Sequence, residues 1–204
     1  SGVADLLANT NATSARFFMN GIDTRTRGVD VVLSYDMDMG DLGSLNLNAG
    51  FNYNDTDVTD IINPPAVLAA VGVEQDNLFA TNELFRIEKG APDSKFIAQI
   101  GWYSHPLELR FSLIRYGKTF DPSTESDAIE RTPHEWVTNL EANVNIGKRI
   151  SISAGANNIF DVYPQVSRKS LMHPTFNDVV FPYSSHSPFG FSGRFLFFKI
   201  AVKI

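Results

Sequence analysis

The side chains best suited to bind a ligand lie in one long segment, residues 159 to 190. This segment contains the imidazoles of His173 and His186, together with Arg168 and Tyr183. Two imidazoles can contribute to a metal site, but the segment has no regular ligand spacing and no third donor. We therefore expect these four residues to contact a ligand in an outer loop, and we predict neither a metal site nor a bound cofactor.

The sequence carries no pattern of an enzyme active site. It has no nucleophile elbow and no phosphate-binding loop. The chain contains no Cys, which excludes disulfides and thiolate metal sites. Asp36, Asp38 and Asp41 resemble a calcium loop only in part, because the required glycine and the distal glutamate are missing. The sequence therefore predicts a protein that is not an enzyme.

Asparagine is the polar residue that alternates most regularly with apolar ones, first between residues 44 and 55. A strand sends successive side chains to opposite faces, so one face here is apolar and the other carries amides. A transmembrane β-barrel needs this arrangement, because its exterior meets lipid and its interior is wet. The residues expected to line the lumen, from this strand and a later one, are Asn46, Asn48, Asn52, Asn139, Asn143 and Asn145.

The same alternation predicts an all-β protein, a transmembrane antiparallel up-and-down barrel. The seven expected strands cover residues 16–37, 44–55, 95–102, 107–113, 136–146, 150–157 and 196–204. Short connections (38–43, 104–106, 147–149) alternate with long ones (56–93, 119–134, 159–190). Outer-membrane barrels sort periplasmic turns and extracellular loops in this way, and a complete single-chain bacterial barrel has an even number of strands. The chain is therefore expected to be the last part of a longer barrel.

Composition agrees with a folded protein that does not bind nucleic acid. Hydrophobic residues make up 43% of the 204 residues, and the net charge is -6. The longest apolar stretch that could be a helix, Pro64–Val73, is about half of the roughly 20 residues that a helix needs to cross a bilayer. Within the first long loop we expect a short helix through Ala66–Ala70 and a second from about Gln75 to Ile87.

Aromatic residues near the strand ends predict a girdle at the membrane interface. They are Tyr35, Tyr53, Trp102, Tyr103, Tyr116 and Trp136.

Four segments, in an order and spacing that agree with these strands, resemble the C-terminal part of a TonB-dependent outer-membrane receptor. They are residues 20–30 (NGIDTRTRGVD), 87–92 (IEKGAP), 157–164 (NNIFDVYP) and 188–195 (PFGFSGRF). The family commonly ends on Phe, whereas this chain ends on Ile204. The alternating Phe198, Ile200, Val202 and Ile204 still resemble the signal that the barrel-insertion machinery reads.

The resemblance implies a barrel of about 22 strands with a plugged lumen. Residues 1–204 would be the C-terminal part of this barrel, and the N-terminal plug domain would lie outside this chain. It also implies energy-coupled uptake of a scarce, large solute, such as a siderophore, another metal chelate, cobalamin or an oligosaccharide, across the outer membrane of a Gram-negative bacterium. The implied partners are outer-membrane lipid, the barrel-insertion machinery and the TonB complex, which would act through the N-terminal region.

Two other functions remain open at this point. The first is an outer-membrane scaffold or adhesion barrel that does not transport a solute. The absence of a plug and a coupling box in the N-terminal region of the protein would indicate this function. The second is a soluble β-sandwich that binds a ligand, which would be monomeric in water without detergent.

Overall fold

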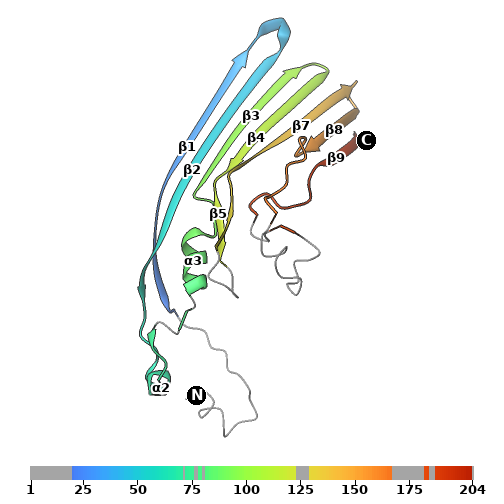
Figure 1. Ribbon diagram of the computed structural model, residues 1–204. Coiled ribbons are helices and arrows are strands. Elements are labelled where there is room, and N and C mark those ends of the chain that lie inside the picture. Colours follow the sequence, from blue (N-terminus) through green and yellow to red (C-terminus); the bar gives the residue numbers. More distant parts are fainter. Residues whose placement is uncertain are drawn as a thin grey trace.

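Seven antiparallel strands form one curved, tilted wall in a computed structural model (Figure 1). The structure describes residues 20–70, 72–75, 78–79, 81–122, 129–166, 182–183 and 187–203. The strands, in their order across the wall, are β1 (Ile22–Asp38), β2 (Ser44–Ile61), β3 (Ser94–Ser104), β4 (Leu107–Tyr116), β7 (Glu135–Ile146), β8 (Ile150–Asn157) and β9 (Phe195–Val202). Each of these strands pairs with the one before it along the chain, which confirms the predicted up-and-down order.

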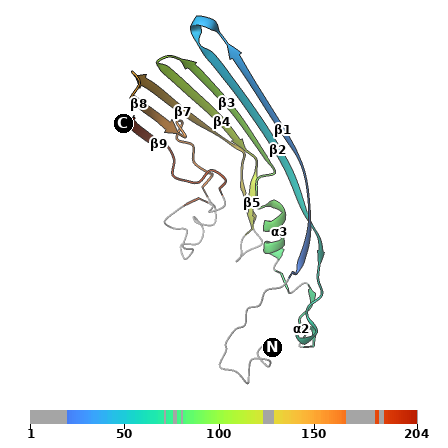
Figure 2. The ribbon, with the colours of Figure 1, turned by 180° about the vertical axis from the view of Figure 1, so that it is seen from behind.

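The wall is open within the described part of the chain. Strands β1 and β9 lie at its two edges, and each pairs with only one other strand (Figure 2). The second sheet has two short strands and is not a layer that could cover the wall. This architecture fits part of a larger barrel and differs from a β-sandwich, because among the described residues the second sheet is only the two-stranded β5–β6 hairpin.

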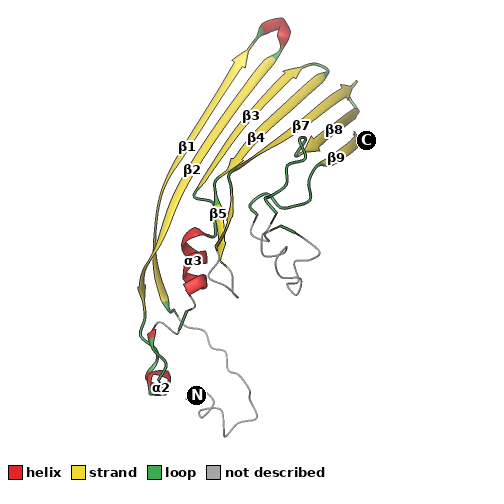
Figure 3. Ribbon diagram, viewed as in Figure 1, coloured by secondary structure: helices red, strands yellow, loops and turns green. Residues whose placement is uncertain are grey.

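The short connections and the long ones lie at opposite ends of the wall, as predicted (Figure 3). The turn between β1 and β2 contains a 3-10 turn, η1 (Gly40–Leu42). Gly40 and Gly43 have φ angles of 61° and 93° there, a region that glycine enters without steric cost. The carboxylate of Asp38 accepts a hydrogen bond of 2.9 Å from the backbone N–H of Gly40, which stabilises the turn.

The long connections contain more structure than the sequence predicted. Helix α2 (Ala66–Ala69) is confirmed, whereas helix α3 (Thr81–Lys89) begins later than the expected Gln75. The side-chain amide of Gln75 donates to the carbonyl of Ile61 at the end of β2. The segment expected to be a plain loop after β4 forms a hairpin of β5 (Thr119–Pro122) and β6 (Ile129–Thr132). Among the described residues, no helix has the length and apolar character needed to span a membrane.

Strands β1 and β2 continue past the rest of the wall toward the long connections. Strand β3 starts at Ser94, opposite Tyr53, whereas β2 runs on to Ile61 and pairs there with β1 alone. At the usual rise per residue this two-stranded extension is about 25 Å long. The expectation that a loop begins at Thr56 is therefore wrong. Opposite charges face each other at these positions, with Arg25 across from Asp57, and such cross-strand pairs support the ladder.

The register of the strands brings all the apolar sets of the sequence onto one face, which we call the apolar face. One row across it contains Tyr35, Leu47, Ile100, Phe111 and Leu140. Many of its side chains are exposed, including Leu33 at 65% and Leu196 at 69%. An apolar surface of this size is unfavourable in water and needs lipid or another apolar cover.

The described residues hold almost no conventional core. Val137 and Ala156 are the hydrophobic residues among them that are buried. The ladders of backbone hydrogen bonds between strands therefore stabilise the wall more than side-chain burial does. A bilayer would complete this structure, because hydrocarbon favours paired backbone groups and apolar side chains on the outside.

Candidate functional site

The opposite face of the wall, which we call the polar face, carries the predicted lumen residues. Asn46, Asn48, Asn52, Asn139, Asn143 and Asn145 all lie on this face by register. Many of their amides bind neighbours on the wall. Asn52 donates to the carboxylate of Asp30 at 2.6 Å, and Asn145 donates to that of Glu108 at 3.0 Å. The polar face is thus a hydrogen-bonded wall in which neutral amides are mixed with charged side chains such as Asp30 and Glu108.

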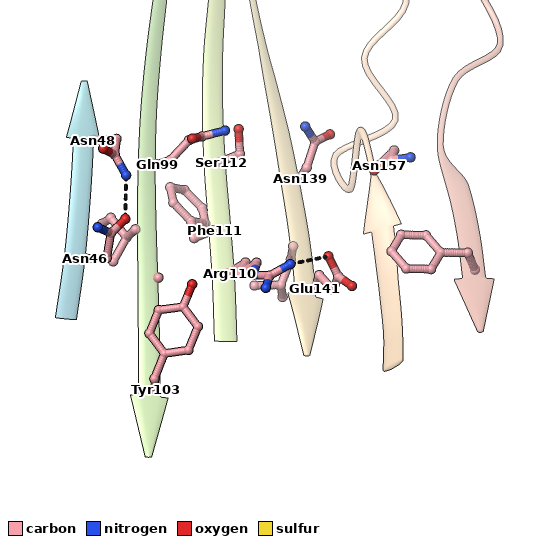
Figure 4. A pocket seen from close by; sticks show the side chains of 14 residues that line it. Asn46, Asn48, Gln99, Tyr103, Arg110, Phe111, Ser112, Asn139, Glu141 and Asn157 are labelled. Carbon is pink, nitrogen blue, oxygen red and sulfur yellow. Dashed lines mark hydrogen bonds and ion pairs between the residues drawn. The ribbon is translucent and has the colours of Figure 1, made fainter. Parts of the chain in front are cut away.

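A shallow hollow of about 290 Å³ lies in the middle of the polar face (Figure 4). Arg110 extends into it, with guanidinium nitrogens 3.8 Å from a carboxylate oxygen of Glu108 and 3.9 Å from one of Glu141. The amides around it come from Asn46, Asn48, Gln99, Asn139 and Asn157. The hollow offers both hydrogen-bond donors and acceptors, because each amide carries an N–H₂ group and a carbonyl oxygen, and this suits a polar surface or solute.

Two glycines create the space beside Arg110. Gly101 and Gly155 lie in the same row as Arg110, and aromatic rings lie over both of them. A Cβ at Gly101 would be 2.9 Å from the ring of Tyr103, and one at Gly155 would be 2.5 Å from the ring of Phe197. Each glycine therefore leaves room for an aromatic ring to approach the backbone of the wall.

The girdle prediction is wrong for two of its six residues. Tyr103 pairs with Ser44 and Glu108, and Tyr116 pairs with Lys95 and Glu135, so both tyrosines face the polar side. The remaining four lie on the apolar face: Tyr35, Tyr53, Trp102 and Trp136. Strand parity, counted from the apolar neighbours of Tyr103, could have shown this from the sequence.

An apolar row also interrupts the polar face. It contains Val32, Gly50, Ile97, Ile114 and Val137. Val32 is 78% exposed whereas Val137 is buried. The polar face is therefore amphipathic. Polar rows lie on both sides of this apolar row, and the one toward the long connections contains Asp30, Asn52 and Lys95.

Hydrogen bonds of Asn158, Asp161 and Arg194 join the two ends of the last long connection. We call this group the clamp. The Asn158 side chain donates to the carbonyl of Val162 at 2.7 Å and accepts from its N–H at 2.9 Å. Asp161 accepts a 2.7 Å hydrogen bond from the backbone N–H of Arg194, and the Arg194 guanidinium donates to the carbonyl of Ile159 at 3.3 Å. The two ends of the connection are thus held together where they enter the wall.

Of the four predicted ligand residues, Tyr183 lies within the part of the chain that the structure describes. Arg168, His173 and His186 lie outside the described residues, so their gathering around a ligand stays a prediction. Tyr183 stacks on Tyr163, with ring centroids 5.6 Å apart and an interplanar angle of 21°. The Asp161 carboxylate raises the pKa of the Tyr163 phenol, because ionising the phenol would bring two negative charges together.

The predicted assembly residues follow the expected alternation. Phe198, Ile200 and Val202 lie on the apolar face and are 67%, 58% and 62% exposed. Ile204 lies outside the described residues. Within the part of the chain that the structure describes, no three His, Cys, Asp or Glu side chains are close enough together to hold a metal ion.

Helix α3 covers the edge of β2 that β3 leaves unpaired. The Glu88 carboxylate accepts a 2.9 Å hydrogen bond from the N–H of Val58, and Lys89 pairs with Asp55 at 3.2 Å. On its other side, Phe85 meets Phe120 of β5 edge to face, with centroids 6.1 Å apart. The helix thus connects the projecting ribbon of β1 and β2 to the small hairpin.

An open wall with an apolar outer face, an amide-lined inner face and long connections at one end defines an outer-membrane β-barrel. The sequence matches the family model "TonB dependent receptor-like, beta-barrel" over residues 3–159. The chain belongs to this family of TonB-dependent receptors, which are outer-membrane receptors of Gram-negative bacteria.

The chain resembles a chain in the structure of the FpvAI–pyocin S2 complex, with 16% identity and a TM-score of 0.48. The similar region covers 71% of this chain and 17% of that one. The search among curated proteins found no match.

Proposed function

We propose that this chain is the C-terminal part of the barrel of an energy-coupled receptor. The receptor would bind a scarce, large solute at its outer loops and pass it through a plugged lumen. The observation that carries this proposal is the amide-lined polar face of a chain that belongs to the TonB-dependent receptor family. The solute class includes siderophores, other metal chelates, cobalamin and oligosaccharides.

The chemistry of the polar face suits a movable plug. Neutral amides such as those of Asn46 and Asn48 can exchange hydrogen bonds with water or with a polypeptide at little cost. Buried ion pairs would have to be desolvated or broken. Charged groups of the hollow are concentrated around Arg110, where the ion pairs are long and exposed to solvent. A plug could therefore rearrange against most of this wall without separating buried charges.

The outer end of the wall would gather the solute. The clamp of Asn158 and Asp161 fixes both ends of the connection that contains His173 and His186. Helix α3 and the β5–β6 hairpin, which contact each other through Phe85 and Phe120, form a second group at the same end. Solute binding at these elements would precede plug movement, and the TonB complex would supply the energy through the N-terminal region of the protein.

The full-length protein tests this proposal in cells with and without a functional TonB complex. Labelled candidate solutes are added, and surface binding and uptake are measured separately. We expect one solute class to bind in both strains and to enter only when the TonB complex works. Uptake that is independent of TonB would contradict energy coupling, and binding without any uptake would favour the alternative of a non-transporting scaffold or adhesion barrel.

A further inference from the structure

One charged side chain lies on the apolar face of the seven-stranded wall. Arg115, near the end of β4, occupies the same row as Phe51, Phe96 and Trp136. Within the rows of the wall, the described residues on this face between Val29 and Val202 are otherwise uncharged. The position of Arg115 therefore needs a physical reason, because an arginine at the middle of a bilayer destabilises the barrel.

The row of Arg115 marks the outer boundary of the apolar band. Beyond it, toward the long connections, the same face continues on β1 and β2 with Arg27 and Asp55. Tyr53 and Trp136 border this boundary and are 43% and 42% exposed. Aromatic side chains of this kind favour the depth of lipid headgroups. Arg115 thus lies near the membrane interface, where an arginine is tolerated and where lipid phosphates are found.

The charges at this boundary are mixed, because Asp57 and Glu88 also lie near Lys89, and the two guanidinium groups are the ones left to bind an anion. Asp55 lies across from Arg27 but is paired with Lys89 at 3.2 Å. Neither Arg27 nor Arg115 has an ion pair with any described residue. Phe96 and Trp136 lie directly across from Arg115 on the two neighbouring strands. Their rings meet edge to face, with centroids 6.2 Å apart. The flexible stem of Arg115 can lie along such apolar surface while its guanidinium reaches toward the headgroups.

We propose that Arg115 and Arg27, flanked by Trp136 and Tyr53, bind the phosphate groups of a phosphorylated lipid in the outer leaflet. Guanidinium matches phosphate geometry with two parallel hydrogen bonds and is weakly hydrated, so it suits a site at the edge of hydrocarbon. The four residues form a belt on β1, β2, β4 and β7, which we call the outer rim. The outer rim would fix the depth of the barrel and hold lipid beside the loops. This inference rests on the membrane placement of the wall and not on solute uptake.

The test uses the full-length receptor, purified from outer membranes in mild detergent. Phosphorylated lipid that remains bound is counted by native mass spectrometry. Binding of vesicle lipid that carries two phosphates is then measured after delipidation. The variants are Arg115→Leu, Arg27→Gln and the double variant. Arg149→Gln, in the turn at the opposite end, is the matched control for loss of one positive charge.

Each substitution in the outer rim should weaken lipid binding about fivefold. This is the loss expected when one basic residue near an anionic surface is removed. Arg115→Leu should leave the heat resistance of the folded barrel unchanged or higher, because leucine suits the apolar face. A loss of lipid binding in this variant is therefore not caused by misfolding. Wild-type binding in the double variant, or an equal loss in Arg149→Gln, would overturn the proposal. Displacement of the lipid by millimolar inorganic phosphate would also overturn it and would indicate a site for free phosphate.

Discussion

At the scale of single residues, Asn158 does more than its sequence motif suggests. It is 8% exposed, has a φ angle of 52° and uses both ends of its amide on the backbone of Val162. Asparagine is one of the few residues with a side chain that enters this backbone region readily. The residue therefore combines an unusual conformation with a local hydrogen-bonding role.

Asn158→Ala should destabilise the barrel by about 1–3 kcal/mol, because it leaves backbone groups of Val162 without partners. Asn158→Gly should cost less, since glycine relieves the positive φ but still removes the side-chain hydrogen bonds. Denaturant titration of the refolded full-length receptor in vesicles measures both. Asn157→Ala is the control and should change little, because Asn157 is exposed. Equal stability of the alanine variants at 157 and 158 would refute the clamp.

Glycine at position 155 is required by close contacts rather than by backbone angle. A Cβ there would lie 2.6 Å from the carbonyl oxygen of Leu140 and 2.5 Å from the ring of Phe197. Gly155→Ala should therefore cost about 1–3 kcal/mol as the wall adjusts. Gly50→Ala is the matched control on β2, because no atom lies within 4 Å of its added Cβ. The folded fraction of each variant after refolding is measured by gel mobility without heating. A similar decrease of the folded fraction in both variants would show that the close contacts of Gly155 do not matter.

At the scale of elements, helix α3 protects an open strand edge. Unpaired strand edges invite pairing with other chains, and here Glu88 fills part of the edge that β3 leaves free. Glu88→Ala should increase protease cleavage between residues 62 and 93 several-fold, because the N–H of Val58 loses its acceptor. Thr81→Ala, at an exposed position on the first turn of the same helix, is the comparison variant. If both variants are cleaved alike, the Glu88 contact is not what holds the helix.

The pair of Lys89 and Asp55 predicts a pH effect on the same helix. The hydrogen bond from Lys89 to Asp55 raises the pKa of Lys89 above 10.5, although burial opposes this shift. The stabilisation is therefore complete below pH 10.5 and is lost as the pH rises through the higher value. Both side chains are exposed, at 41% and 46%, so the effect is at most about 1 kcal/mol.

Cleavage of the loop between residues 62 and 93 should therefore rise by up to about fivefold above pH 10.5 in the wild type. Lys89→Met should already be cleaved at neutral pH as fast as the wild type is at high pH. Its cleavage should change little as the pH rises. A wild-type profile that stays flat as the pH rises well above 10.5 would show that this pair does not hold α3.

At the scale of the whole molecule, the long connections and the wall have separable tasks. Strand β2 ends at Ile61, and Glu88 and Lys89 return to it from α3. Replacing residues 62–87 by a short glycine-serine linker should therefore leave the barrel assembled. Solute capture by the full-length receptor should fall at least tenfold if this loop gathers the solute. Normal receptor abundance in the outer membrane is the necessary control, and unchanged capture would assign binding to the other loops.

The faces of most strands could be predicted from the sequence, whereas side-chain neighbours could not. Leu45, Leu47 and Phe51 lie on the apolar face as expected, because alternation is a local property of extended backbone. Tyr103 was assigned to the girdle from its place near a strand end, yet the register places it on the polar face. The extension of β2 was missed because its charges resemble a loop until Arg25 and Arg27 are seen across from them.

The sequence alone determined the seven strands, their two faces and the sorting of turns from long connections. These follow from period-two alternation and from turn residues, which act over a few neighbouring positions. Tertiary structure decided the contacts between residues far apart in the chain, such as Asp161 with Arg194, and Arg110 with Glu141. It also placed Arg115 alone among apolar neighbours from other strands. Register sets these contacts, and register depends on the simultaneous pairing of all the strands.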